Sequence, residues 1–124
     1  MLRQGPVPAF VHGVIEYVAG AVFILAPFLF GFDSGAAKAV SIVAGIAILV
    51  VTASSDLPTG LSRVIPINIH VVFDFLLAAI LVASPFLFGF SHDDAAMVFF
   101  IALGVAHLLI TIATRFLPAR GERA

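Results

Sequence analysis

Two histidine–carboxylate pairs are the residues of this chain whose types and spacing could do chemistry. His12 precedes Glu16 and His70 precedes Asp74, so each imidazole stands four residues before a carboxylate. On a helix this spacing places both side chains of a pair on one face, where they can interact. Two imidazoles and two carboxylates have the donor atoms that suit a divalent metal ion, and His107 could supply a fifth donor.

Three interpretations of these pairs stay open at the level of sequence. The pairs can be polar contacts that hold helices together, ligands of a metal ion, or steps in a proton or ion relay. Spacing alone is a weak signal for metal, because no HExxH-like motif accompanies it. Haem ligation by two histidines is disfavoured, since His12 and His70 begin their apolar segments rather than lie at their centres. No cofactor is predicted.

The composition indicates that lipid surrounds these residues. Of the 124 residues, 62% are hydrophobic and only 10% are charged, which lies outside the usual range of soluble domains. The chain contains no cysteine, which excludes disulfides, thiolate metal sites and cysteine nucleophiles. Its net charge of -1 gives no reason to expect a nucleic acid as a partner.

Four apolar segments are long enough to cross a bilayer, which takes about 20 residues of helix. Helix is favoured over strand because backbone N–H groups in lipid must be satisfied within their own segment, and the segments lack the alternation of a barrel strand. The sequence therefore predicts an all-α membrane protein with four transmembrane helices, in a single transmembrane domain over residues 1–124. The predicted spans are Phe10–Phe32, Ala36–Ser54, Ile67–Phe90 and Ala95–Phe116.

The chain consists of two copies of one helical hairpin. Residues 7–32 align without a gap with residues 65–90, and the hexapeptide PFLFGF is identical in both copies. Because each copy holds an even number of spans, we expect the hairpins to be related by a pseudo-twofold axis along the membrane normal. The predicted boundaries are repeat one at 7–55, a linker at 56–64 and repeat two at 65–116.

A stripe of small and polar residues runs along one face of each predicted helix. Such a stripe is expected to face the other helices and turn away from lipid. In the first and third spans it consists of His12, Glu16, Gly20, Phe23 and Pro27, and of His70, Asp74, Ala78, Leu81 and Pro85. In the second and fourth spans it consists of Ser41, Gly45, Thr52 and Ser55, and of Gly104, His107, Thr111 and Thr114.

Proline and glycine recur at the end of the first span of each repeat. Pro27 and Pro85 each remove one backbone hydrogen bond, so a kink or an early helix end is expected there. Gly31 and Gly89 permit the left-handed turn that closes a helix. The acidic residues that follow suit the positive N-terminus of the next helix and are expected to cap it. These residues are Asp33, Asp93 and Asp94.

Basic residues predict the orientation of the spans. Those on one side of the four-span arrangement outnumber those in the two hairpin loops, where Lys38 stands among acidic residues. By the positive-inside rule, both termini and the central linker are expected to be cytoplasmic. The basic residues on that side are Arg3, Arg63, Arg115, Arg120 and Arg123.

At these residues the chain resembles the SPW repeat family of small bacterial membrane proteins, whose repeat has a His-x-x-x-Asp start and a Ser-Pro-Trp motif followed by Gly-Phe. The second copy reads His70, Asp74, Ser84-Pro85-Phe86 and Gly89-Phe90, and the first reads His12, Glu16, Ala26-Pro27-Phe28 and Gly31-Phe32. Phe28 and Phe86 stand where the family has tryptophan, which removes any role of an indole N–H. The resemblance implies a protein of the bacterial inner membrane and supplies no activity.

The leading functional hypothesis is a noncatalytic membrane module that self-associates or serves as an accessory subunit of a larger membrane complex. It is motivated by the lack of a nucleophile–base set and of a glycine-rich phosphate loop. The alternative is a small ion, proton or metal-handling protein that uses the two pairs and His107. A membrane enzyme is least favoured, because no nucleophile or electrophile accompanies the candidate acids and bases. The predicted partners are the lipid bilayer and a further copy of the chain or a larger membrane complex.

Overall fold

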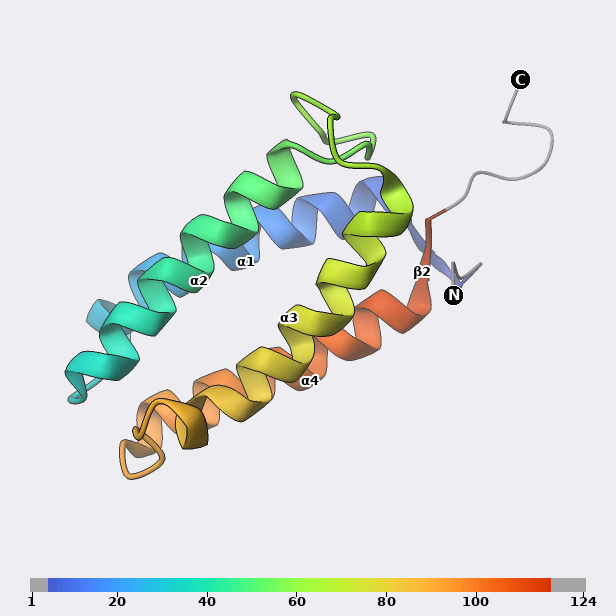
Figure 1. Ribbon diagram of the computed structural model, residues 1–124. Coiled ribbons are helices and arrows are strands. Elements are labelled where there is room, and N and C mark those ends of the chain that lie inside the picture. The colour runs from blue at the N-terminus through green and yellow to red at the C-terminus, as the bar shows by residue number, and fades with distance from the viewer. Residues whose placement is uncertain (1–4, 117–124) are drawn as a thin grey trace, which may run out of the picture.

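Two antiparallel helical hairpins make up the fold, in a computed structural model that describes residues 5–116 (Figure 1). Helix α1 packs along α2 in the first hairpin, and α3 packs along α4 in the second. All four helices are long and apolar enough to cross a membrane. The prediction of an all-α membrane protein with four spans is therefore confirmed. The helices are α1 at Ala9–Leu29, α2 at Gly35–Ala53, α3 at Ile67–Leu87 and α4 at Asp94–Ala113.

Short strands tie the two hairpins together at the end where the chain begins. Strand β1, Val7–Pro8, pairs in parallel with β2, Thr114–Arg115. An isolated parallel bridge joins Ser55 to Ile65. In the repeat alignment Ile65 is the counterpart of Val7, and Thr114 is the counterpart of Ser55. The start of each repeat therefore pairs with the end of the other, so the two links are equivalent contacts.

The PFLFGF hexapeptide closes the first helix of each hairpin. The N–H of Phe32 donates to the carbonyl of Pro27 at 3.1 Å, and Gly31 between them has φ of +64°. This six-to-one bond around a left-handed glycine is the Schellman arrangement, and Gly89 repeats it in the second copy with φ of +72°. Of the two outcomes expected at the prolines, a kink or an early helix end, the early end does not occur at Pro27 and Pro85 themselves, because the helices continue two residues further, to Leu29 and Leu87.

The carbonyl that Pro27 leaves without its helical donor finds another partner. Proline has no N–H, so the carbonyl four residues before it, that of Phe23, receives no bond from position 27. The hydroxyl of Ser41 on α2 donates to this carbonyl at 2.6 Å. The stripe residue Ser41 therefore allows α1 to continue through Pro27 while it binds α2 to α1.

Glycines let α1 and α2 approach each other closely. A Cβ atom on Gly45 would stand 2.5 Å from the carbonyl oxygen of Gly20, and a Cβ on Gly20 would stand 2.7 Å from the side chain of Leu49. Small residues at a helix crossing give this close approach in membrane proteins. The stripes predicted for the first and third spans are buried at every position, which confirms that they face the other helices.

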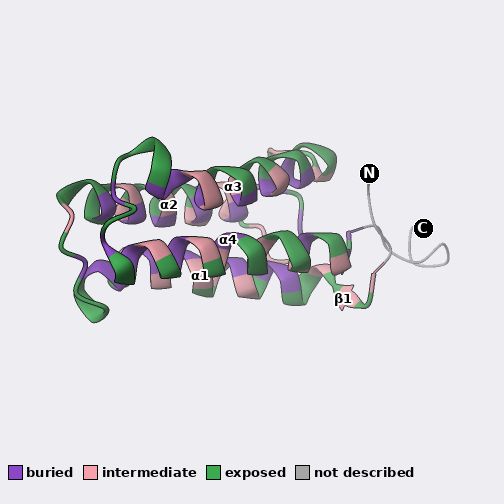
Figure 2. Cartoon of the chain, turned by 90° about the horizontal axis from the view of Figure 1, so that it is seen from below, coloured by how far each residue is buried: buried purple, intermediate pink, exposed green. Residues whose placement is uncertain are grey.

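Two apolar cores lie at opposite ends of the molecule. The larger one is rich in phenylalanine and packs ring against ring, as in Phe23 with Phe99 at 4.8 Å and Phe90 with Phe100 at 5.0 Å between centroids. The smaller one, centred on Leu57, lies at the end that holds the strands. All four helices carry exposed large apolar residues, which lipid would surround. Figure 2 shows exposed positions on each of the four helices.

The two hairpin loops meet through Asp93. Its carboxylate caps α4 by accepting from the N–H of Ala96, and one oxygen also accepts from the N–H groups of Asp33 and Ser34 in the other loop at 2.8 and 2.9 Å. The prediction that Asp33 caps α2 is wrong, because Ser34 is the N-cap and accepts from Ala37. Burial opposes ionisation of Asp93, but these N–H donors hold the pKa of its carboxyl below its usual range.

Replacement of Asp93 by Ala should therefore destabilise the protein by about 1–2 kcal/mol at neutral pH, because a helix cap and a link between the hairpins are lost together. Since the pKa of Asp93 is lowered on folding, its contribution is present above pH about 4 and is lost as pH falls through the folded-state pKa. Reversible unfolding in detergent, followed from pH 7 to pH 3, measures both effects. Asp94→Ala, an exposed neighbour, is the control; an equal loss in both variants would contradict the assignment.

Candidate functional site

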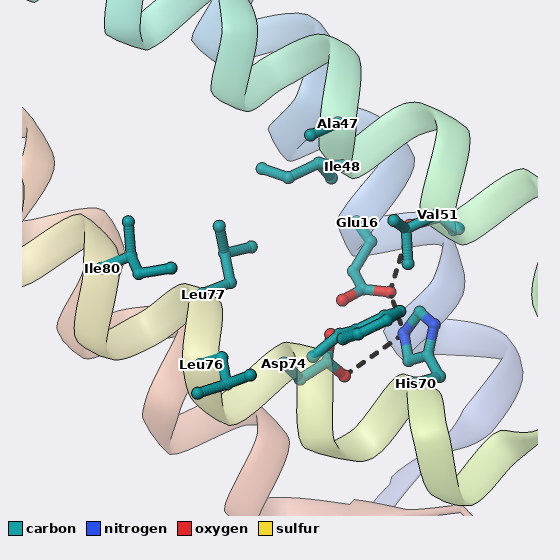
Figure 3. Close-up of a pocket in the computed structure, with 11 residues that line it drawn as sticks. Glu16, Ala47, Ile48, Val51, His70, Asp74, Leu76, Leu77 and Ile80 are labelled. Carbon is teal, nitrogen blue, oxygen red and sulfur yellow. Dashed lines mark hydrogen bonds and ion pairs between the residues drawn. The ribbon is translucent and has the colours of Figure 1, made fainter.

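The two histidine–carboxylate pairs meet between the hairpins and are fully buried. His12 Nε2 lies 3.0 Å from Asp74 Oδ2 and 3.1 Å from Glu16 Oε2. His70 Nε2 lies 2.8 Å from Glu16 Oε1 and 3.3 Å from Asp74 Oδ2 (Figure 3). Each imidazole therefore contacts both carboxylates, one from its own helix and one from the opposite hairpin. We call these four residues the polar cluster.

Hydroxyl groups hold the other nitrogen of each ring. Nδ1 of His12 lies 2.8 Å from Thr114 Oγ1, and Nδ1 of His70 lies 2.6 Å from Ser55 Oγ. Both hydroxyls also donate to the backbone carbonyl four residues earlier, at 2.6 and 2.5 Å. Because a hydroxyl has one proton, its oxygen is left to accept, and we assign the ring proton to Nδ1. Both Nε2 atoms then face the cluster.

The hydroxyl contacts cross from one repeat to the other. Ser55 ends the first repeat and binds the histidine of the second, while Thr114 ends the second repeat and binds the histidine of the first. Neither hairpin therefore contains a complete site. The polar cluster forms only when both hairpins are packed together, and the strand pairings beside Ser55 and Thr114 hold that arrangement.

His107 approaches the polar cluster from α4. Its Nε2 lies 3.4 Å from Asp74 Oδ1 and 3.8 Å from Glu16 Oε2. This nitrogen is buried and makes no hydrogen bond among the described residues, although the side chain as a whole is 12% exposed. The position equivalent to His107 in repeat one is Ile48. A third imidazole therefore faces the polar cluster on one side without a counterpart on the other.

Two buried carboxylates require positive charge close to them, because an isolated ionised carboxylate out of water is costly. Hydrogen bonding supplies only part of the compensation, as when Thr52 donates to Glu16 Oε1 at 3.3 Å. Two imidazolium protons would neutralise the cluster, and so would one divalent cation. The residues present are chemically suited to either state.

The donor atoms have the spacing of a small cation site. One ligand atom from each of the four residues lies within 4.8 Å of all the others. The four nitrogen–oxygen separations run from 2.8 to 3.3 Å. A tetrahedral site with bonds of about 2.0–2.2 Å has edges of about 3.3–3.6 Å. An ion at the centre would therefore require these nitrogen and oxygen atoms to move apart.

A family model described as SPW repeat domain matches residues 10–114. The chain belongs to this family. Comparisons with curated proteins and with solved structures found no match. The resemblance seen in the sequence is thereby confirmed, and the family together with the four apolar helices identifies a multi-pass membrane protein. In this SPW repeat protein, the histidine and the acid that begin each repeat are the residues of the polar cluster.

The structure brings the residues singled out in the sequence together, and their role as metal ligands stays a prediction. All five candidates lie together: His12, Glu16, His70, Asp74 and His107. Ser55 and Thr114 were recognised only as members of a polar stripe, and their bonds to the histidines were not foreseen. The sequence feature that could have indicated this role is that Ser55 and Thr114 are hydroxyl residues at the same aligned position, the end of each SPW repeat.

Removal of either hydroxyl should leave a buried Nδ1–H without its acceptor. Ser55→Ala and Thr114→Val are each expected to lower the free energy of unfolding by about 1–3 kcal/mol. The neighbouring Ser54→Ala, whose hydroxyl makes no contact with a histidine, is the matched control. Titration of the three variants with denaturing detergent measures the difference. A loss no larger than that of Ser54→Ala would show that the hydroxyls do not hold the rings.

Proposed function

We propose that this SPW repeat protein binds a divalent transition-metal ion in the polar cluster, within the membrane. The observation that carries the proposal is the convergence of two carboxylates with the Nε2 atoms of two imidazole rings. Both rings are already oriented by hydrogen bonds at Nδ1. Histidine ligands of metals characteristically donate their second ring N–H to an outer partner, which fixes the ring and its tautomer. Ser55 and Thr114 fill that role for the two histidines.

His107 favours a metal site over a purely structural contact between helices. Two imidazoles are enough to pair both carboxylates of a polar clamp, yet a third imidazole faces the same carboxylates. His107 Nε2 lies 3.4 Å from Asp74 Oδ1 and makes no hydrogen bond in the described residues. Bound metal would engage this nitrogen as a fifth donor or as a replacement ligand during exchange.

Mixed nitrogen and oxygen donors favour Zn²⁺ or a neighbouring transition metal. Imidazole suits zinc, copper and nickel, whereas magnesium and calcium prefer sites made of oxygen. The surroundings disfavour conduction, because the aromatic core separates the cluster from the hairpin loops and no chain of polar side chains crosses it in residues 5–116. We therefore favour binding of an ion over its conduction or a proton relay.

We further propose that the protein lies in the bacterial inner membrane with both ends and the linker in the cytoplasm. In the described residues, Arg63 and Arg115 lie at the end that carries the strands, whereas Asp33 and Asp93 lie at the hairpin loops. Arg3, Arg120 and Arg123, on which the orientation also rests, lie outside the described residues. Lipid is the proposed partner of the exposed apolar surface; self-association and an accessory role stay predictions.

Protein purified without a histidine tag should bind one Zn²⁺ per chain. Replacing His12 and His70 together by Ala should abolish this binding, since half of the donors are removed. His92→Ala, in an exposed loop, should bind as the wild type does. Ser55→Ala should weaken binding about 10–100-fold through loss of ring orientation. Elemental analysis and competition with a chromophoric chelator provide the measurement; retention of zinc by the double variant would refute the site.

Single cysteines can test the orientation, because the natural chain has none. Ser62→Cys lies in the linker and Ser91→Cys lies in a hairpin loop, and both positions are exposed. In intact cells, a membrane-impermeant maleimide should label Cys at position 91, while position 62 should react only after the membrane is opened. Equal labelling of both before opening, or the reverse pattern, would contradict the proposed orientation.

A further inference from the structure

A cavity of about 230 Å³ lies between α2 and α3, beside the polar cluster (Figure 3). Apolar side chains from both helices line most of it, including Ile48 from α2 and Leu77 from α3. Leu76 and Ile80, which also line it, are about half exposed on the outer surface of α3. The cavity therefore opens sideways, toward the position of lipid, rather than toward either end of the bundle.

The inner end of this cavity borders the polar cluster, although nearly all of the cavity's accessible surface is apolar. Glu16, His70 and Asp74 reach it from the polar cluster, and Thr52 reaches it from α2. The hydroxyl of Thr52 already donates its proton to Glu16. The polar groups that a bound molecule could contact at this end are therefore chiefly carboxylate oxygens, which accept hydrogen bonds. An apolar chamber with hydrogen-bond acceptors at one end is the general form of a small-molecule site.

The cavity lies beside a position at which the two repeats differ. Ile48 lines the cavity, whereas its counterpart in repeat two is His107, which fills the other flank of the cluster with an imidazole. One flank of the cluster therefore carries an imidazole, and the other carries an apolar side chain that lines the cavity.

We propose that the cavity binds a membrane-dissolved amphiphile, a single ring that carries one hydroxyl group and an alkyl chain. The hydroxyl donates to the carboxylate edge of the polar cluster, the ring lies against Ile48 and Leu77, and the chain extends past Ile80 into lipid. An engineered protein cavity of about 150 Å³ holds benzene, so this larger one has room for a substituted ring. A neutral donor suits it better than an amine, because the cluster is already charge-compensated.

The inference goes beyond the proposed function, since it requires the cavity and the carboxylates and does not require an ion. The probes are 4-hexylphenol and hexylbenzene, which share a ring and a chain and differ in the hydroxyl. Uptake by protein in phosphatidylcholine nanodiscs, corrected for uptake by empty nanodiscs, is measured with zinc present and with zinc removed. One saturable hexylphenol site per chain is expected, with hexylbenzene about tenfold weaker, as one hydrogen bond worth about 1.4 kcal/mol would give.

The repeat provides a matched pair of variants. Ala47→Phe places a ring in the cavity and should abolish hexylphenol binding, while Ala106→Phe, at the equivalent exposed position of α4, should leave it unchanged. In wild-type protein, nuclear Overhauser contacts from the probe should reach the methyl groups of Ile48 and Ile80 and not those of Ile101. This second measurement needs no variant, so it decides the question even where Ala47→Phe does not fold.

Equal uptake of the two probes, or contacts spread over Ile101 as well, would overturn the proposal by showing that the cavity merely takes up apolar material. Binding that survives Ala47→Phe would do the same. Zinc stoichiometry is measured on the same samples, so the two proposals fail separately. Loss of probe binding with one zinc retained removes only the cavity assignment. Probe binding by protein that takes up no stoichiometric zinc when zinc is supplied removes only the metal assignment.

Discussion

Burial of two carboxylates inside a membrane is the constraint on which the rest of this structure depends. An acidic side chain at the centre of a transmembrane helix costs about 2.5–3.5 kcal/mol on insertion scales unless it finds partners. Glu16 and Asp74 find them in both imidazoles, one of which always belongs to the opposite hairpin. Separation of the hairpins would remove at least one imidazole contact from each acid. The polar cluster therefore holds the two hairpins together, whereas lipid could solvate their apolar surfaces as well as protein does.

The two ends of the molecule are joined by devices that serve the same purpose. At the strand end, Val7 with Thr114 and Ile65 with Ser55 connect the start of each repeat to the end of the other, and the same two hydroxyl residues orient the histidines. At the loop end, Asp93 accepts hydrogen bonds from both loops. The aromatic core lies between Asp93 and the cluster. The residues that pair the strands also orient the histidines, so a change in the strand pairing would alter the geometry of the polar cluster.

Features that depend on residues close together in the chain could be predicted from the sequence. Side-chain contacts with a partner on another helix could not. Span length, the buried stripes and the left-handed turn at Gly31 follow from residues near one another in the chain, and all were predicted. The spacing of His12 and Glu16 indicated a contact within one helix, but the stronger pairing of His70 with Glu16 depends on the depth at which the hairpins cross. For the same reason the cap of α2 was misassigned: Asp33 was free to point elsewhere because Ser34 and the distant Asp93 satisfy that turn.

Duplication explains how a small chain can assemble the polar cluster. Two equivalent hairpins bring two histidines and two acids to one point, since each hairpin needs only one histidine, one acid and one hydroxyl. Equivalent halves would also give equivalent flanks, and an ion or a small molecule would then meet the same surroundings on both sides. His107 and Ile48 remove that equivalence at a single aligned position. One flank carries a further imidazole and the other an apolar side chain beside the cavity, so the two sides of the cluster differ in the chemistry that they present.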